Sequence, residues 1–147
     1  MDAGHKNALM TGSLYGHADL SALSKGQLSG KVAGVYAFWR GEELYYVGMS
    51  GNLAIRLKSH YSGGRSGDQF CIYVQDHTLL PDFTPETLTA IANRTLRIDH
   101  LVRDYVRAHL KFRLTLTTDT DAAKALEEEA LDGALGVKPL LNEWARQ

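Results

Sequence analysis

The spacing of hydrophobic and polar positions changes along the chain, and it first predicts an antiparallel hairpin. Residues 32–39 and 44–48 are rich in β-branched and aromatic side chains, and a short charged stretch separates them. Apolar side chains at intervals of four then predict a helix over about 52–61. Residues 112–117 alternate and are rich in Thr, which indicates a strand with one buried face.

Between and after these elements the pattern predicts a loop, a strand and two helices. Gly and Ser dominate the loop, apolar and aromatic residues alternate in the strand, and a Thr-Pro-Glu sequence opens the longer helix. A capping Asp opens the last helix, and glycine and proline end it. These four elements are expected at 62–67, 70–74, 85–110 and 121–135.

The first 18 residues show no clear period, and a short helix is expected between residue 19 and Gly30. The expected order is β-β-α-β-α-β-α, an α/β (α+β) fold in which helices flank a small central antiparallel or mixed sheet. We expect a partly ordered N-terminal extension over 1–30. One domain should follow over 31–147, with an insertion around 62–111 that contains the long helix.

Composition and charge exclude several classes of protein. The chain has 147 residues and 44% hydrophobic residues, enough for one core of ordinary size. With 16 basic against 17 acidic residues, the net charge of -1 excludes a uniformly basic chain, so binding to nucleic acid needs a local patch. The lone Cys71 excludes a disulfide framework and a multi-cysteine zinc site. We expect a cytoplasmic protein with no membrane partner, because no apolar run approaches the ~20 residues that span a bilayer.

Four side chains near the hairpin are candidates for chemistry. The hairpin brings Tyr36 and Tyr46 onto adjacent strands, and Arg56 and His60 are four residues apart on one face of the next helix. The helix thus offers a permanent cation beside a group that exchanges protons near neutral pH. Taken singly, the tyrosines also fit ordinary sheet packing, and Arg56 and His60 fit a solvated helix face.

Taken together, these residues resemble the GIY-YIG nuclease family. Gly34-Val35-Tyr36 and Tyr46-Val47-Gly48 are similar to the two tripeptides that name the family, with Val in place of Ile. Arg56 and His60 match its Arg-x-x-x-His on the following helix. The resemblance implies a GIY-YIG type fold and an endonuclease that hydrolyses phosphodiester bonds of DNA, including single-stranded or branched DNA.

The family's remaining elements find matches near the end of the chain. Glu127 after Leu126 resembles the family's metal-binding Glu, and Asn142 after Pro139 resembles its late Asn. This resemblance implies that Glu127 holds Mg²⁺ or Mn²⁺, and a single carboxylate suits such a hydrated ion. Glu128 and Glu129 compete for the same role, and Leu126 before Glu127 favours Glu127.

The chemistry of phosphodiester hydrolysis suggests a role for each candidate. Tyr36 would be the general base with His60 relaying its proton, and Arg56 would stabilise the transition state. Tyr46 would position the water or the phosphate, and Asn142 would support the site through its amide. Gly48 would leave room for the substrate.

The substrate and the partners follow less directly from the sequence. Arg94 and Arg97 begin a locally basic stretch that would bind DNA phosphates or form an ordinary charged face. Arg65 in the Gly-Ser loop receives no role. A homodimer would let two sites cut both strands. Two other functions stay open: a nucleic-acid-binding module of the same fold without turnover, and a protein-interaction domain.

Overall fold

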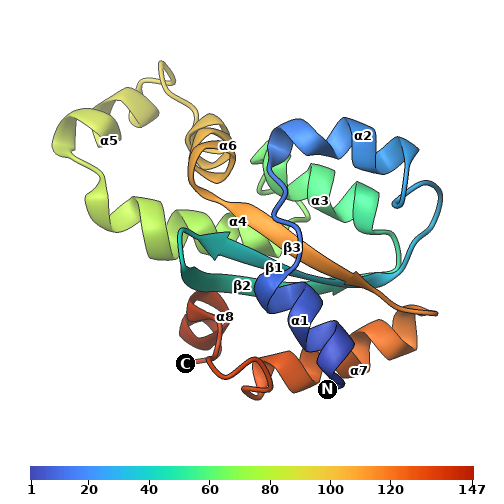
Figure 1. Ribbon diagram of the computed structural model, residues 1–147. Coiled ribbons are helices and arrows are strands. Elements are labelled where there is room, and N and C mark those ends of the chain that lie inside the picture. Colours follow the sequence, from blue (N-terminus) through green and yellow to red (C-terminus); the bar gives the residue numbers. More distant parts are fainter.

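A three-stranded antiparallel sheet forms the centre of the computed structural model, which describes all 147 residues. The strand order is β2-β1-β3, so β1 (Gly34–Arg40) lies between β2 (Glu43–Ser50) and β3 (Lys111–Leu116) (Figure 1). The predicted hairpin and the predicted Thr-rich strand are therefore confirmed. Strand β1 is paired on both edges and covered on both faces, so its residues 34–39 are buried and their side chains are held rigidly.

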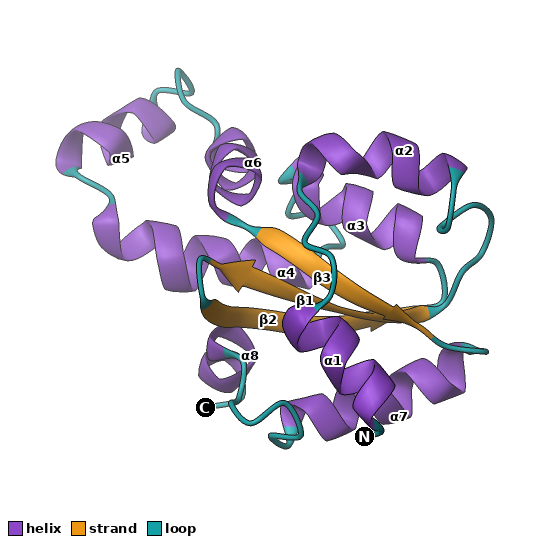
Figure 2. Cartoon of the chain, viewed as in Figure 1, coloured by secondary structure: helices purple, strands orange, loops and turns teal.

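Helices cover both faces of the sheet, which gives a mixed α+β fold (Figure 2). Val35, Ala37 and Trp39 point to one face and Tyr36 and Phe38 to the other, as the alternation of a strand requires. The first face packs against α1 (Ala3–Thr11) and α7 (Thr120–Leu131). The second face packs against α2 (Leu20–Lys25), α3 (Leu53–Ser62) and α6 (Ile98–His109). The last helix, α8 (Leu140–Ala145), lies along the edge strand β2.

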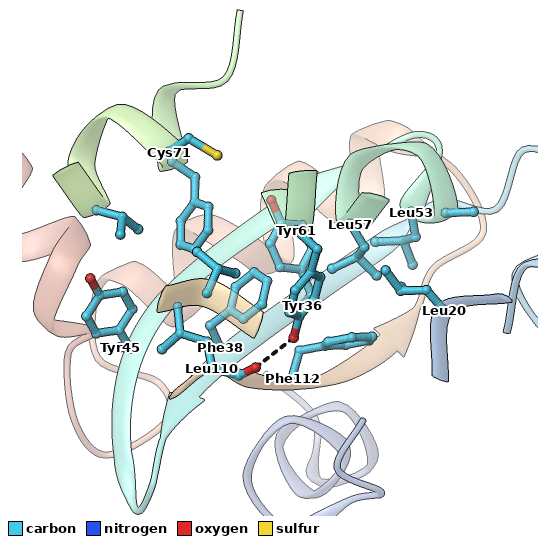
Figure 3. Close-up of a cluster of buried hydrophobic side chains, with 14 of the residues drawn as sticks. Leu20, Tyr36, Phe38, Tyr45, Leu53, Leu57, Tyr61, Cys71, Leu110 and Phe112 are labelled. Atoms are coloured by element: carbon cyan, nitrogen blue, oxygen red, sulfur yellow. Dashed lines mark hydrogen bonds between the residues drawn. The ribbon is translucent and has the colours of Figure 1, made fainter. Parts of the chain in front are cut away.

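The second face carries the larger hydrophobic cluster, which holds the ring of Tyr36 among apolar side chains (Figure 3). Leu53, Leu57 and Tyr61 of α3 point into this cluster, so the predicted helix over 52–61 is confirmed. The Tyr61 hydroxyl donates a hydrogen bond to the carbonyl of Leu110 at 2.8 Å. This packing fixes α3 over the sheet and thereby sets the position of the polar side chains that α3 carries.

The predicted strand over 70–74 is wrong. The segment is the helix α4 (Gln69–Tyr73), which continues into a π-helical turn, η2 (Val74–Leu79), and a 3₁₀ turn, η3 (Leu80–Asp82). Phe70, Cys71 and Val74 are buried, a spacing that suits one helix face, and periodicity alone cannot separate so short an apolar run from a strand. The Asp68 carboxylate accepts from the Cys71 backbone N–H and caps the helix.

The single long helix predicted over 85–110 is also wrong, because two helices occupy this stretch. These are α5 (Pro85–Ala92) and α6, and Arg94 between them has a positive φ of 62° that no helix continues through. No residue of α5 is buried, and α5 extends away from the body of the molecule (Figure 1).

The ends of the chain differ from the prediction in smaller ways. The helix predicted over 121–135 is confirmed as α7, but it ends at Leu131, where Gly133 with a φ of 103° turns the chain away, and the helix α8 that follows was not predicted. The short helix α2 is confirmed after a 3₁₀ turn, η1 (His17–Asp19), whereas α1 was not predicted. Leu9 of α1 is fully buried, and the Trp39 indole donates to its carbonyl at 3.2 Å. None of the helices combines the length and the apolar character that crossing a membrane requires.

Candidate active site

A small pocket of about 100 Å³ lies at the edge strand β2, where helices from both layers approach the sheet. Two strands contribute its floor, α3 and α4 contribute one wall, and α7 contributes the other. Five side chains predicted from separate parts of the sequence line it, together with Gly48. These are Tyr36, Tyr46, Arg56, His60 and Glu127. The fold therefore brings most of the predicted site residues to one place.

Tyr36 and His60 form the buried end of the pocket. The Tyr36 hydroxyl lies 2.6 Å from His60 Nε2, and each residue is only 2% exposed. Tyr36 is opposite Gly48 in the β1–β2 register. A β-carbon on Gly48 would overlap the Tyr36 hydroxyl, so the absence of a side chain there makes room for the tyrosine. The absence of a side chain at Gly48 thus allows Tyr36 to take this position.

Asp68 completes a chain of hydrogen bonds behind His60, and the sequence analysis did not include it. His60 Nδ1 lies 2.8 Å from Asp68 Oδ2, and Asp68 is 1% exposed. The Ser59 hydroxyl also donates to Asp68 Oδ2, at 2.6 Å. A carboxylate only accepts hydrogen bonds, so His60 Nδ1 carries the hydrogen. In the neutral ring Nε2 is then the acceptor, and the Tyr36 hydroxyl donates to it.

Burial and these hydrogen bonds decide the protonation states at neutral pH. Burial raises the pKa of Asp68, but hydrogen bonds from His60 and Ser59 outweigh it and lower the pKa to about 2. Burial lowers the pKa of His60 against the opposing effect of the Asp68 carboxylate. Asp68 is therefore ionised, and the imidazole of His60 is neutral and able to accept a proton.

Tyr36 is fully protonated at neutral pH. Burial raises its pKa well above the ordinary value of 10.0, and Tyr46 adds to the rise, while the charge of Arg56 acts in the opposite direction. The burial of a phenolate without a counter-charge is costly. Tyr36 can therefore lose its proton only to an acceptor in direct contact, and His60 Nε2 is that acceptor.

Arg56 and Tyr46 form the side of the pocket that opens to solvent. Arg56 is exposed, and no acidic side chain forms an ion pair with its guanidinium. Its charge lowers the pKa of Tyr36, Tyr46 and His60 alike, which places it near all three. Tyr46 is half-buried, and burial followed by the charge of Glu127 raises its pKa. A free guanidinium beside a hydroxyl suits the binding of a phosphate group.

Glu127 is the acid of the Glu127–Glu129 run that faces the pocket. It is half-buried, whereas Glu128 and Glu129 are exposed and lie outside the pocket lining. Burial raises the pKa of Glu127, and the neighbouring charge of Glu128 adds to the rise. A nearby cation would relieve both effects, because an opposite charge favours the ionised carboxylate.

The carboxylates available limit which metal the pocket could hold. Asp68 also lines the pocket, but its oxygens accept hydrogen bonds from Ser59, His60 and the Cys71 backbone N–H, so Glu127 is the one carboxylate left for a metal. The structure contains no cluster of three or more His, Cys, Asp or Glu side chains arranged for a metal ion. The pocket instead combines Glu127 with the hydroxyl oxygen of Tyr46 in a volume of about 100 Å³. Mg²⁺ accepts this kind of all-oxygen set, since it is held by one or two carboxylates and keeps several waters. The donor set therefore fits hydrated Mg²⁺ and does not fit zinc.

Three predicted site residues lie outside the pocket. Asn142 on α8 pairs with the backbone of Val47: its Oδ1 accepts from the Val47 N–H at 2.8 Å, and its Nδ2 donates to the Val47 carbonyl at 2.9 Å. The amide thus occupies the free edge of β2 where another strand would pair, and it holds the residue next to Tyr46. Arg94 and Arg97 line a separate pocket with Arg65.

No protein-family model, curated protein or solved structure matches the chain.

Proposed function

We propose that the chain is a Mg²⁺-dependent endonuclease of the GIY-YIG type that hydrolyses phosphodiester bonds of DNA. The observation that carries the proposal is the convergence of Tyr36, Arg56, His60 and Glu127 on one pocket. These residues come from β1, α3 and α7, and all four belong to the sequence pattern that resembles the GIY-YIG family. The hydrogen-bonded chain from Asp68 through His60 to Tyr36 adds a route for the proton of the attacking water.

In this mechanism Tyr36 accepts one proton and gives up another at the same time. As the water attacks phosphorus, it gives its proton to the Tyr36 oxygen while the Tyr36 hydroxyl proton passes to His60 Nε2. Tyr36 is thus never a free phenolate in its buried position. The resulting imidazolium donates from Nδ1 to the Asp68 carboxylate, which lies 2.8 Å away and stabilises the new positive charge. Asp68 acts through His60 and is a positioning residue.

The open side of the pocket would bind the phosphate. Arg56 has a guanidinium free of protein partners, so it can donate to the phosphate oxygens as negative charge grows on them. Tyr46 would orient the scissile group by its hydroxyl. Glu127 would hold Mg²⁺ or Mn²⁺, which when bound supplies positive charge to the phosphate and the departing oxygen. The departing oxygen takes its proton from solvent on this side.

The test uses supercoiled plasmid with Mg²⁺, and compares the wild-type protein with Glu127→Gln and with Glu128→Gln as a matched control. We expect nicked product from the wild type and from Glu128→Gln, and none from Glu127→Gln or after addition of EDTA. Equal cutting by Glu127→Gln would contradict the role of Glu127. Absence of cutting by the wild type, with Mg²⁺ or Mn²⁺ and on duplex, single-stranded and branched DNA, would refute the nuclease.

One observation favours a second function, a nucleic-acid-binding module of the same fold without turnover. Tyr36 is only 2% exposed, and the pocket of about 100 Å³ leaves little space beside its hydroxyl. If the pocket does not open, water cannot reach Tyr36 and the protein would bind DNA without cutting it. Salt-dependent DNA binding by a wild-type protein that shows no metal-dependent cleavage would select this function.

A further inference from the structure

Arg94 and Arg97, together with Arg65 from about thirty residues earlier in the chain, line one pocket outside the candidate active site. This pocket has a volume of about 310 Å³ and lies between the Gly-Ser loop and the start of α6. Arg65, Arg94 and Arg97 line it, and Asp99 is the only acidic residue in its lining. Three positive charges face one negative charge, so the pocket keeps an excess of positive charge although the whole chain is nearly neutral.

Arg65 is held in place by two hydrogen bonds, and one of them pairs it with Asp99, the single acidic residue of the pocket. Its Nε donates to Asp99 Oδ1 at 2.5 Å, and its terminal nitrogen donates to Gln75 Oε1 at 2.7 Å. The hydrogen bond from Arg65 lowers the pKa of Asp99, so this carboxylate stays ionised and engaged with Arg65. One edge of the pocket is therefore fixed before any ligand arrives, which reduces the entropy lost on binding.

Arg94 and Arg97 have no such partners. Both are exposed, and neither takes part in an ion pair or a side-chain hydrogen bond. Arg94 also has a φ of 62°, a conformation that favours glycine, so the backbone of this turn gives no reason for an arginine there. Two unpaired guanidiniums beside a fixed third are suited to an anion, and guanidinium groups match phosphate oxygens in geometry.

This pocket lies close to the candidate active site along the chain. Arg65 precedes Asp68 by three residues, and Asp68 contacts His60. Three residues span at most about 11 Å between Cα atoms. One strand of duplex DNA carries a phosphate about every 3.4 Å along the helix axis, so this span is comparable to a few nucleotides of a DNA strand.

We propose that Arg65, Arg94 and Arg97 form a subsite that binds a phosphate of the DNA backbone a few nucleotides from the scissile one. The proposal rests on the proposed nuclease function and assigns a role to the segment between α5 and α6. The subsite contributes affinity and register, and it takes no part in the chemical step.

The test measures binding of a fluorescein-labelled DNA duplex and its single strand by anisotropy, without metal, over a range of KCl concentrations. The variant is the double substitution Arg94→Gln and Arg97→Gln. Its control is Lys6→Gln with Lys138→Gln, which removes the same charge from two exposed residues elsewhere in the fold. Each lost phosphate contact lowers the slope of log affinity against log salt by roughly 0.9 for duplex DNA. One backbone phosphate shared by two arginines therefore predicts a slope reduced by about 1, with the control unchanged.

Two further measurements separate this proposal from its alternatives. Arg94→Lys with Arg97→Lys keeps the charges, and we expect it to retain the wild-type slope. In cleavage assays, the Gln double variant should need a higher DNA concentration for half-maximal cutting than the wild type, whereas the Lys6→Gln, Lys138→Gln control should not. An unchanged slope in the Gln variant, an equal loss in the control, or no DNA binding by the wild type would overturn the subsite. Wild-type protein that binds DNA through these arginines but never cuts it would overturn only the nuclease.

Discussion

Replacing Asp68 by Asn is the sharpest perturbation of the proposed proton route. The substitution keeps the size of the side chain and removes its charge. Asp68 accepts hydrogen bonds from His60 Nδ1, the Ser59 hydroxyl and the Cys71 backbone N–H. An Asn side chain has one oxygen for these three donors, so at least one donor loses its partner or meets an NH₂ group.

The cost in stability follows from the buried donors that Asp68 satisfies, because leaving one of them without a partner costs about 1–3 kcal/mol. Hydrogen bonds from His60 and Ser59 outweigh burial and lower the pKa of Asp68 from 3.8 to about 2, so the ionised carboxylate stabilises the folded protein at neutral pH. This stabilisation is complete above the unfolded pKa near 4 and is lost as the pH falls through about 2. Urea unfolding at pH 7 should therefore show Asp68→Asn about 2 kcal/mol less stable than the wild type. The difference should shrink between about pH 4 and pH 2.

Expressed as a free energy, the loss of cleavage rate in Asp68→Asn should exceed the loss of folding stability. Without the carboxylate nothing balances the imidazolium that forms when Tyr36 passes its proton to His60. In an Asp–His–Ser triad the corresponding Asn substitution lowers kcat about 10⁴-fold, so we expect a single-turnover rate lower by about 10²–10⁴-fold. The hydrogen bond and charge of Asp68 raise the pKa of His60, so their loss lowers it further. The acid limb of any residual activity should then move to lower pH.

Asp82→Asn is the matched control for Asp68→Asn. Asp82→Asn makes the same chemical change at an exposed residue of η3, and it should alter neither stability nor rate. The assay must be run well below the unfolding midpoint of each variant, so that lost rate is not lost fold. A folded Asp68→Asn protein that cuts DNA at the wild-type rate, with an unmoved acid limb, would refute the proton route through His60.

Three other substitutions test single features of the site. Arg56→Ala should lower the single-turnover rate about 10²–10³-fold and leave urea stability within about 0.5 kcal/mol, because Arg56 is exposed and free of ion pairs. Gly48→Ala should lower both the cleavage rate and, by about 1–3 kcal/mol, the thermal stability, because its β-carbon would displace the Tyr36 hydroxyl. Asn142→Leu should cost about 2 kcal/mol in urea unfolding, because the N–H and carbonyl of Val47 lose their partners.

The parts of the fold that sequence patterns predict correctly are those in which the local pattern and the tertiary environment agree. The hairpin is such a case, since β-branched and aromatic residues fill two strands that are buried by helices on both faces. The division between α5 and α6 could not be predicted from apolar spacing, because Leu88 and Ile91 continue the helical period although no residue of α5 is buried. The helix is broken over residues 93–97, where Arg94 is left-handed and Arg97 is extended, and arginine carries no sequence signal for either conformation.

In the same way, sequence patterns predict some of the functional residues and miss others. Tyr36, Arg56, His60 and Glu127 could be predicted because each belongs to a short pattern that carries its own spacing. The clustering of Arg65 with Arg94 and Arg97 could not, since it depends on how the insertion folds back on the Gly-Ser loop. Composition gives no hint of it, because the net charge of the chain is -1.

Asp68 was missed for the same reason that the strand over 70–74 was wrong. A strand there leaves residue 68 in the polar connection between the Gly-Ser loop and the strand, where nothing indicates a role for its side chain. A helix makes the same residue an N-cap, because Asp before an apolar run is a common helix start. The two carboxylate oxygens then serve two ends of the structure: Oδ1 accepts from the Cys71 N–H of α4, and Oδ2 accepts from His60 of α3. Correct assignment of α4 would thus have pointed to a fixed carboxylate eight residues after the histidine that it orients.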